Sequence, residues 1–527
     1  MKKFLLLFLL TVTSFQFAFA GNDDPFTVEL EALNIPGAPG LHSFTFAKHD
    51  NKWLLIGGRT NGLHGMTPST AFPRTYANRM VYVIDYNTNQ VWSRNLFTDL
   101  SIAQADPLRS TNLQGIQVGT KLYVCGGFGI DSLIGNYETF PMLTAIDVPQ
   151  MMNAVINGTS MASSVKQVKD TRVEVCGGDM EYMNGFFYLI GGHDFRGNYI
   201  QVGNNDQKYT NSYKKFKIDE TSSTISITDY YEYIDTVNLH RRDLNVSPAL
   251  KPDMTPYIII YGGVFQHNID LPFQNPVYMD ANGCSVDMSF TQKMCQYHTA
   301  HLSMFDSVTG KMYTTLFGGT SLYDYNSGNY ERDTLVPFID DIVLLTKNAN
   351  GSTIEEVLPA KMPGLLGTSS EMIKSENVSA YDNQVIKFRS IQGRTLVGYI
   401  YGGIRATLPN GGPSTANDVI YKVFITPNPV SVENISSEVP EKYSLSQNYP
   451  NPFNPVTNIE FKISNPDFVK LKVYDVMGKE VSALVNQNLT PGTYKINFDG
   501  SRLTSGMYFY KLETSKFTDV KKMILIK

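Results

Sequence analysis

The stretch KWLLIGG, Lys52 to Gly58, places a run of apolar residues directly before a glycine pair. A short apolar run bounded by glycine is typical of a strand buried on both faces, and glycine permits a backbone exit at positive φ. The pattern recurs as KLYVCGG, FFYLIGG, YIIIYGG, MYTTLFGG and VGYIYGG, with first glycines at positions 57, 126, 191, 262, 318 and 402. A signature repeated at such long intervals indicates a repeat architecture.

Each glycine pair lies within a set of apolar or alternating runs, which predicts a four-stranded sheet for each of six units. In the first unit the runs are LHSFTFA, KWLLIGG, MVYVIDY and QVWSRNLF. The sixth unit has only VIKFRSI, LVGYIYGG and DVIYKVFI before it stops at Pro427, whereas FTVELEAL, Phe26 to Leu33, has no unit of its own. We expect this N-terminal segment to supply the missing strand and to close a ring, because closure removes exposed sheet edges.

The hydrophobic run, the glycine pair and the later aromatic residues, here Tyr82 and Trp92 in the first unit, resemble the kelch family over residues 26 to 425. The resemblance rests on the sixfold repetition. It implies an all-β fold in which the six units are the blades of a β-propeller.

The N-terminus, MKKFLLLFLLTVTSFQFAFA, combines two lysines, an apolar run and Ala18-Phe19-Ala20, and this is typical of a secretory signal peptide at residues 1–20. No later stretch is long and apolar enough to span a bilayer. The formal net charge of −5 gives no global attraction to nucleic acid or acidic membranes, so neither is expected as a partner. We expect the mature chain to work outside the cytoplasm.

Composition changes after a Pro/Ser/Asn-rich linker at 426–440, and short alternating runs over 441–527 predict a small Ig-like β-sandwich. The segment YPNPFNP at Tyr449–Pro455, Val473-Tyr474-Asp475, Gly506-Met507-Tyr508 and the basic end from Lys521 closely resemble the type A C-terminal sorting domain of the type IX secretion system. The resemblance implies export across the outer membrane of a Gram-negative, Bacteroidota-like bacterium by that machinery. Removal of the domain or attachment to the cell surface then follows. Residues 21–425 remain for the propeller.

The segments that follow the glycine pairs are long and rich in aromatic and charged residues, whereas most turns between the first two strands are tight. Long loops on one face of a rigid ring are where binding sites usually lie. The candidate ligand-binding residues are Arg109, Arg172, Arg241, Arg242, His193, Asp194, Tyr323, Tyr325 and Tyr330.

The four arginines precede predicted first strands, where their guanidiniums would converge on the channel mouth and favour a carboxylate-bearing ligand. The alternative, which we favour, is pairing with the nearby Asp106, Asp170 and Asp243. The three tyrosines would form a sugar-stacking platform, or are surface tyrosines without a ligand.

Four cysteines occur, and an exported protein is open to oxidation. Cys284 and Cys295 are close in sequence, which makes them the candidate disulfide. Cys125 and Cys176 either pair across adjacent units or are small core residues, and we favour the second interpretation.

Tyr297-His298 with His301 is similar to part of the copper site of galactose oxidase-like kelch propellers, but no histidine follows His301. The remaining histidines lack ligand spacing, so we expect no metal and no cofactor. The chain also lacks a G-x-S-x-G elbow, a P-loop and an H-E-x-x-H motif.

Two functions follow from these features. The first is a secreted or cell-surface binding module for a glycan or protein ligand, which needs no catalytic constellation. The second rests on a resemblance to six-bladed kelch mutarotases that act on sialic acid. In this case the arginines would hold the sugar carboxylate, and a nearby acid or histidine would move a proton. Fold alone does not decide between them, and we favour the binding module.

Overall fold

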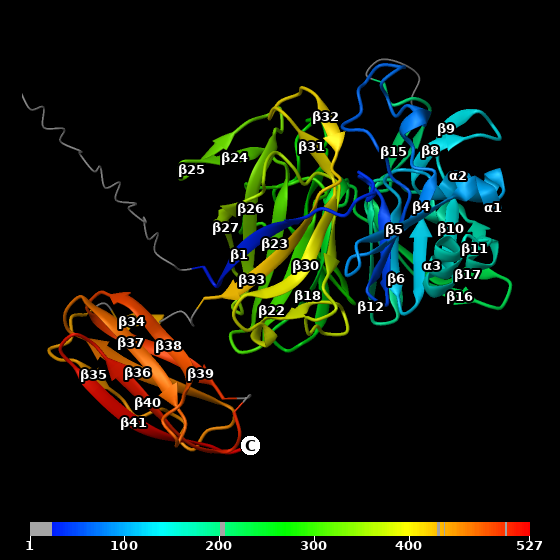
Figure 1. Ribbon diagram of the computed structural model, residues 1–527. Coiled ribbons are helices and arrows are strands. Elements are labelled where there is room, and N and C mark those ends of the chain that lie inside the picture. The colour runs from blue at the N-terminus through cyan, green and yellow to red at the C-terminus, as the bar shows by residue number, and fades with distance from the viewer. Residues whose placement is uncertain (1–23, 201–205, 429–432, 437, 501–502) are drawn as a thin grey trace, which may run out of the picture. The chain divides into compact units, whose positions relative to one another are not determined.

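The computed structural model describes residues 24–200, 206–428, 433–436, 438–500 and 503–527, so the predicted signal peptide lies outside the described residues. The chain divides into two compact units, a larger one of Thr27–Pro427 and a smaller one formed mainly by Asn428–Lys527. Each is described by itself. Figure 1 shows that strands dominate both units, so the chain is all-β.

Of the nine sheets that the described residues of the larger unit form, six are built mostly from consecutive antiparallel strands, and we number these six in chain order. Sheet 1 has β2 (Thr45–His49), β3 (Lys52–Ile56), β4 (Met80–Asp85) and β5 (Gln90–Asn95); sheet 2 has β6 (Gln114–Val118), β7 (Lys121–Cys125), β10 (Met142–Asp147) and β11 (Val165–Lys169). Sheet 3 has β12 (Asp179–Met183), β13 (Phe186–Ile190), β16 (Ser212–Glu220) and β17 (Ile225–Ile234); sheet 4 has β18 (Arg242–Leu250), β19 (Pro256–Val264), β20 (Val277–Asp280) and β21 (Gly283–Val286).

Sheet 5 has β22 (His301–Asp306), β23 (Lys311–Thr320), β26 (Phe338–Lys347), β27 (Thr353–Lys361) and the short parallel strand β29 (Ile386–Lys387). Sheet 6 has β28 (Ser370–Lys374), β30 (Thr395–Gly402), β33 (Ile420–Pro427) and β1 (Phe26–Leu33). The run VIKFRSI, expected as the first strand of the sixth unit, instead supplies β29 at the edge of sheet 5. The short run SEMIK forms the first strand of sheet 6.

The N-terminal strand β1 lies beside β33, so the segment without a unit of its own completes sheet 6, as expected. Its side chains alternate between buried and exposed at Phe26, Thr27, Val28 and Glu29. This period of two is what one packed face of a strand requires.

The glycine pairs are the points at which one sheet meets the next. The first glycine of every pair has a φ between 58° and 75°. A Cβ atom there would lie 1.8 to 3.0 Å from a carbonyl oxygen in the segment that leads into the first strand of the next sheet. Those oxygens belong, in order, to Ser110, Val175, Arg241, Gln296, Leu366 and Leu41. Only glycine fits this approach, and the sixth contact returns from sheet 6 to sheet 1.

A circle of backbone hydrogen bonds links residues at or just before the starts of the six first strands. Ser43 donates to Ser369 (3.1 Å), Asn112 to Ser43 (3.2 Å) and Gly177 to Asn112 (3.0 Å). Asp243 donates to Gly177 (2.7 Å), His298 to Asp243 (2.8 Å) and Ser369 to His298 (2.7 Å). We call these six residues the axial ring. Each lies at or near the start of the first strand of a different sheet, so the hydrogen bonds join the six sheets in cyclic order.

The segments after the glycine pairs carry strands of their own. β8 (Phe128–Asp131), β9 (Asn136–Thr139), β14 (His193–Arg196) and β15 (Asp206–Tyr209) form one sheet that joins the loops of sheets 2 and 3. β24 (Tyr323–Asn326) pairs with β25 (Asn329–Arg332), and β31 (Ile404–Ala406) pairs with β32 (Ser414–Ala416). Figure 1 shows these strands at one end of the larger unit, which we call the long-loop face.

Among the described residues, three α-helices, which the sequence did not lead us to expect, lie in the connections of sheets 1 and 2. They are α1 (Leu96–Asp99), α2 (Ile102–Leu108) and α3 (Val148–Asn157). The Asp147 side chain caps α3 by accepting from the Gln150 amide at 3.0 Å. Met151 and Met152 of α3 are buried in the apolar cluster of sheets 1 and 2.

The smaller unit has two four-stranded sheets around one apolar cluster. The first contains β34 (Glu433–Ser436), β39 (Gly492–Asp499), β36 (Val456–Ile463) and β35 (Ser444–Leu445); the second contains β38 (Glu480–Leu489), β37 (Asp467–Tyr474), β40 (Gly506–Glu513) and β41 (Thr518–Leu525). The predicted linker at 426–440 lies partly outside the described residues. Its described part includes β34, which pairs with β39.

Candidate functional site

The long-loop face carries eight large apolar side chains that are 45% to 73% exposed. They are Leu63, Met66, Tyr76, Leu133, Ile134, Ile269, Leu335 and Leu408, and they come from the loops of five different sheets. In the described part of the larger unit, seven other exposed large apolar residues lie outside the segments that follow the glycine pairs. Exposed apolar side chains that gather at one end of a unit are a feature of binding surfaces, whereas singly scattered ones are normal.

The predicted arginines are engaged within the protein. Arg109 is 3% exposed and pairs with Asp106 at 2.7 Å, and Arg172 pairs with Asp170 at 2.6 Å. The Arg172 side chain holds the pKa of Asp170 below its ordinary value. Both ion pairs are those named as the alternative to ligand binding.

Arg241 is 1% exposed, and its guanidinium donates to the carbonyls of Asn238, Gly262 and Asn275 at 2.7 to 2.8 Å. Arg242 pairs with Asp243 at 2.8 Å and also donates to the hydroxyls of Tyr209 and Tyr199. The Arg241 guanidinium is therefore occupied by backbone carbonyls of sheet 4 and the segments beside it. Arg242 is occupied by Asp243, a residue of the axial ring, and by two tyrosine hydroxyls.

His193 and Asp194 lie on β14 but take part in separate contacts. His193 is 4% exposed, its Nδ1 lies 2.8 Å from Gln207 Nε2, and burial holds its pKa well below the ordinary value. Asp194 pairs with Arg196 at 3.3 Å, and Arg196 also contacts Glu138 and Glu174. Burial raises the pKa of Asp194, and Arg196 opposes that rise.

The three candidate tyrosines do come together on the hairpin β24–β25. Tyr325 and Tyr330 meet edge to face at 4.9 Å, and the Lys293 ammonium lies 4.1 Å from the Tyr330 ring centre. All three are only half-exposed, because they pack on the apolar cluster of sheets 4 and 5.

All four cysteines are free thiols. Cys284 and Cys295, the candidate disulfide, pack in different apolar clusters, and Cys295 donates to the Lys293 carbonyl at 3.2 Å. Although Cys284 and Cys295 are close in sequence, they form no disulfide in this structure. Burial raises the pKa of both thiols to about 12.

A cavity of about 210 Å³ lies beside the axial ring and is lined by residues from or next to all six first strands. We call it the axial cavity. Its lining includes four carboxylic acids, Asp179, Glu181, Asp243 and Glu371, together with His298 and His301, and it contains no lysine or arginine. A wider cavity of about 750 Å³ shares the side chains of Glu181, His301 and others and opens towards the tight turns.

The acids of the axial cavity have strongly shifted proton affinities. Burial raises the pKa of Asp179 to about 7, and burial with the charge of Asp179 raises that of Glu181 to about 8. The same two causes raise the pKa of Glu371 well above its ordinary value. His298 Nε2 lies 3.9 Å from Glu371 Oε1, and burial lowers the pKa of His298 to about 4.

Sequence reasoning missed these acids, although the repeat contained the signal. Asp179 and Glu371 stand two positions after the axial-ring residues Gly177 and Ser369, and Gln114 stands two after Asn112. An alignment of the units on the ring residue would have placed all three at equivalent positions beside the axial ring.

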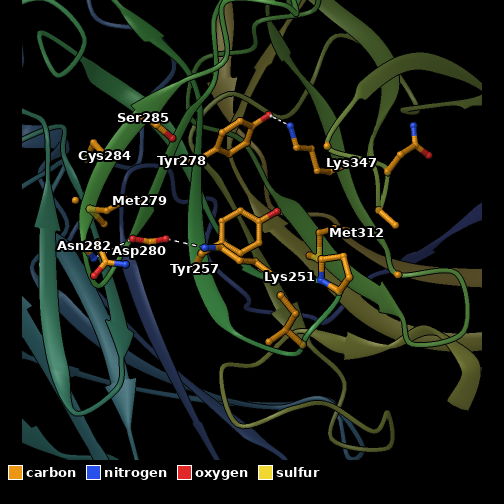
Figure 2. A pocket seen from close by; sticks show the side chains of 17 residues that line it. Lys251, Tyr257, Tyr278, Met279, Asp280, Asn282, Cys284, Ser285, Met312 and Lys347 are labelled. Carbon is orange, nitrogen blue, oxygen red and sulfur yellow. Dashed lines mark hydrogen bonds and ion pairs between the residues drawn. The ribbon is translucent and has the colours of Figure 1, made fainter.

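A third cavity, of about 470 Å³, lies between sheets 4 and 5 near the tight turns (Figure 2). Its charged groups are paired: Lys251 with Asp280 at 2.7 Å, and Lys347 with the Asp287 carboxylate at 3.2 Å. Figure 2 shows the Tyr257 hydroxyl pointing into this space. The lining thus combines tyrosines and methionines with neutralised charges.

Within the described residues, no group of three or more histidine, cysteine, aspartate or glutamate side chains could hold a metal ion. Over the same residues, no helix has both the length and the apolar character needed to cross a membrane.

In the smaller unit, the YPNPFNP segment is fastened to the C-terminal strand. Phe453 is 2% exposed, its amide donates to the Ile524 carbonyl at 2.9 Å, and Asn451 Oδ1 accepts from the Ile524 amide at 2.9 Å. Residues 447–527 match the secretion system C-terminal sorting domain. The sorting domain implies export through the type IX secretion system of Bacteroidetes to the cell surface or the extracellular space, and contact with that machinery.

No curated protein matches the chain. Among solved structures, the chain is similar to PorZ, described as an essential bacterial surface component of the type IX secretion system of Porphyromonas gingivalis. The identity is 10% and the TM-score 0.13, over 92% of this chain and 75% of that chain. A TM-score this low supports no inference about fold or function.

Proposed function

We propose that the chain is an extracellular or cell-surface binding protein whose larger unit is a six-bladed kelch-type propeller with its ligand on the long-loop face. The glycine contacts between successive sheets and the axial ring support the propeller. The two sheets around one apolar cluster support an Ig-like sandwich for the sorting domain.

The exposed apolar side chains of the long-loop face carry this proposal. They favour a protein ligand over a glycan, because protein interfaces bury apolar cores whereas sugar sites need exposed aromatic faces and free polar groups. The tyrosines of β24–β25 pack against the protein, and the candidate arginines are bound internally.

The experiment is site-specific photo-crosslinking on the intact exported chain, displayed by the producing bacterium. A photoreactive phenylalanine replaces Leu133 or Leu335, and the control replaces Met254, which is 42% exposed in the tight turn between β18 and β19. One adduct of defined mass from both long-loop positions, absent from the control, is expected.

Equal adducts from Met254 would contradict the proposal. If no adduct forms, an array of neutral and acidic glycans probed with the purified chain decides the ligand class. Glycan binding would replace the protein ligand by a sugar. A negative array as well would remove the long-loop face as the binding surface.

The second candidate is a sugar-modifying enzyme of the six-bladed kelch mutarotase type. The shifted acids of the axial cavity favour it, because such groups gather at active sites. An acidic sugar would nevertheless find no lysine or arginine in that lining. Anomer exchange of sialic acid and of neutral sugars, followed by NMR with wild type and Glu371→Gln, tests it. Acceleration that the substitution removes would establish the enzyme.

A further inference from the structure

The axial cavity gathers acidic side chains, most of which have no cationic side chain beside them. Asp243 is matched by Arg242 at 2.8 Å. Among the described residues, Asp179, Glu181 and Glu371 have no lysine or arginine partner, and Glu371 approaches only the His298 imidazole, at 3.9 Å. Three carboxyl groups therefore share one small space of about 210 Å³.

A second observation concerns Gln114, which is 2% exposed and lines the same cavity. Its Nε2 donates to the Asn112 carbonyl, but its Oε1 accepts no hydrogen bond from the described residues. A buried acceptor without a donor is costly, so this wall of the cavity fits a guest that carries N–H groups.

The guest that satisfies both features is a cation with several donors. The described residues include no group that could hold a metal ion, whereas an alkylammonium carries three N–H donors and one charge. We propose that the axial cavity binds a small organic cation of the alkylammonium class, held by Asp179, Glu181 and Glu371 with Gln114 as a further acceptor. This site is separate from the long-loop face and does not depend on the proposed function.

The surrounding charges restrict the guest to a single ammonium group. His298, in the segment before β22, and His301, the first residue of β22, line the same cavity as the acids, and burial lowers both pKa values. On the side of the wider cavity, Lys48 lies next to the last residue of β2, Lys374 ends β28, and Glu376 lines the same space. A second ammonium on a longer guest would meet these lysines.

Binding must compete with protons, because the acids hold protons near neutral pH. As pH rises through about 7 for Asp179 and about 8 for Glu181, the carboxylates ionise and the cation gains its partners. An alkylammonium keeps its own proton over this range, since its pKa is about 10. Affinity should therefore increase with pH, and binding below pH 8 should release protons.

The test is calorimetric titration of the intact chain with n-butylamine at pH 6 and pH 8.5. At least tenfold tighter binding at pH 8.5 is expected, with no binding of butan-1-ol or butyrate. Glu371→Gln should weaken binding at least tenfold, whereas the matched control Glu376→Gln, an exposed acid of the wider cavity, should not.

Proton release gives a readout that does not depend on the variants folding. Titration of the wild type at pH 7.5 in two buffers of different ionisation enthalpy should give different heats. No binding at pH 8.5, equal binding of butan-1-ol, equal heats in the two buffers, or the same loss for both variants would overturn the proposal. Displacement of n-butylamine by calcium chloride at equal concentration would also overturn it in favour of a metal.

Discussion

The first glycine of each pair explains why so short a motif organises so large a unit. Its positive φ and its contact with a carbonyl of the next sheet leave no room for a side chain. The apolar residues before it build one sheet, and the glycine sets the distance to its neighbour.

Gly126 allows a direct test of that role. A Cβ atom at Gly126 would lie 1.8 Å from the Val175 oxygen, whereas one at Gly119 would meet nothing within 4 Å, although both residues have φ near 60°. We expect Gly119→Ala to lower the free energy of unfolding by about 1 kcal/mol through backbone strain. Gly126→Ala should cost a further 1–3 kcal/mol, roughly, through displaced packing.

Urea unfolding followed by tryptophan fluorescence measures both variants, because the only two tryptophans, Trp53 and Trp92, lie in sheet 1 of the larger unit. If both variants lose the same unfolding free energy, backbone strain alone would explain why glycine is needed at position 126, and the contact with Val175 would not matter.

Asp287 is the residue whose charge should matter most in acid. Burial alone would raise its pKa, but hydrogen bonds from Ser289 and Tyr278 and the Lys347 ammonium outweigh it and lower the pKa to about 2. A depressed folded-state pKa gives stability that is present above pH 4 and lost as pH falls through 2. The contribution at pH 6 is about 2 kcal/mol.

Asp287→Asn should therefore be less stable than wild type by about that amount at pH 6, and the difference should shrink towards pH 2. Tryptophan fluorescence during urea unfolding at pH 6, 4 and 2.5 measures it. Asp50→Asn, in a side chain that is 80% exposed, is the control and should differ little at any of these pH values. A stability difference that stays constant between pH 6 and pH 2.5 would mean that the pKa of Asp287 is not lowered in the folded protein.

At the scale of elements, β1 is the N-terminal strand that completes sheet 6. Val28 is buried and its neighbour Thr27 is exposed. Val28→Ala should cost about 2 kcal/mol of unfolding free energy, from lost apolar contact and the cavity left behind. Thr27→Ala should stay within about 0.5 kcal/mol. Urea unfolding compares them, and equal effects would mean that β1 is not packed as described.

Much of the strand order could be predicted, because the apolar runs and the glycine pairs are local and repeated. The first strand of sheet 6 could not, since SEMIK is short and polar next to the more apolar VIKFRSI. The helix α3 was also missed. Its MMNAVIN run is apolar on one face, but the four-strand repeat left no place for a helix.

The candidate site was less predictable, because it depends on contacts between units. The acids near Arg109, Arg172 and Arg242 could be named from the sequence as their partners, and these pairs form. The gathering of Asp179, Glu181 and Glu371 could not be named, because nothing local shows that positions from sheets 3 and 6 share one axis.

At the scale of the whole molecule, the sorting domain should decide where the protein goes. A chain that ends at residue 446 is expected to stay in the periplasm, because the match to the sorting domain begins at 447. Fractionation of the producing bacterium with an antibody to the larger unit measures this. If the truncated chain reaches the cell surface in the same amount as the full chain, residues 447–527 are not needed for export.

Within that domain, Phe453 links the family motif to the last strand. Phe453→Ala should destabilise the domain by about 3–5 kcal/mol and reduce export. The control is Met477→Ala, at a side chain that is 87% exposed, which should be exported normally. The measurement is the ratio of protein on the cell surface to protein in the periplasm. If Phe453→Ala is exported as well as wild type, sorting does not depend on the packing of Phe453.

The pairing of β1 with β33 also sets an order of events during synthesis. The two strands lie roughly 390 residues apart in the chain. The ribosome therefore makes β1 before the rest of this unit, and β1 stays unpaired until β33, the last strand of the unit, has been made. Bringing such distant segments together carries a large loop-closure entropy cost, which the other five sheets reduce as they assemble. A ribosome that stalls before residue 420 thus leaves an open chain with an unpaired edge, which a periplasmic protease can recognise as unfinished.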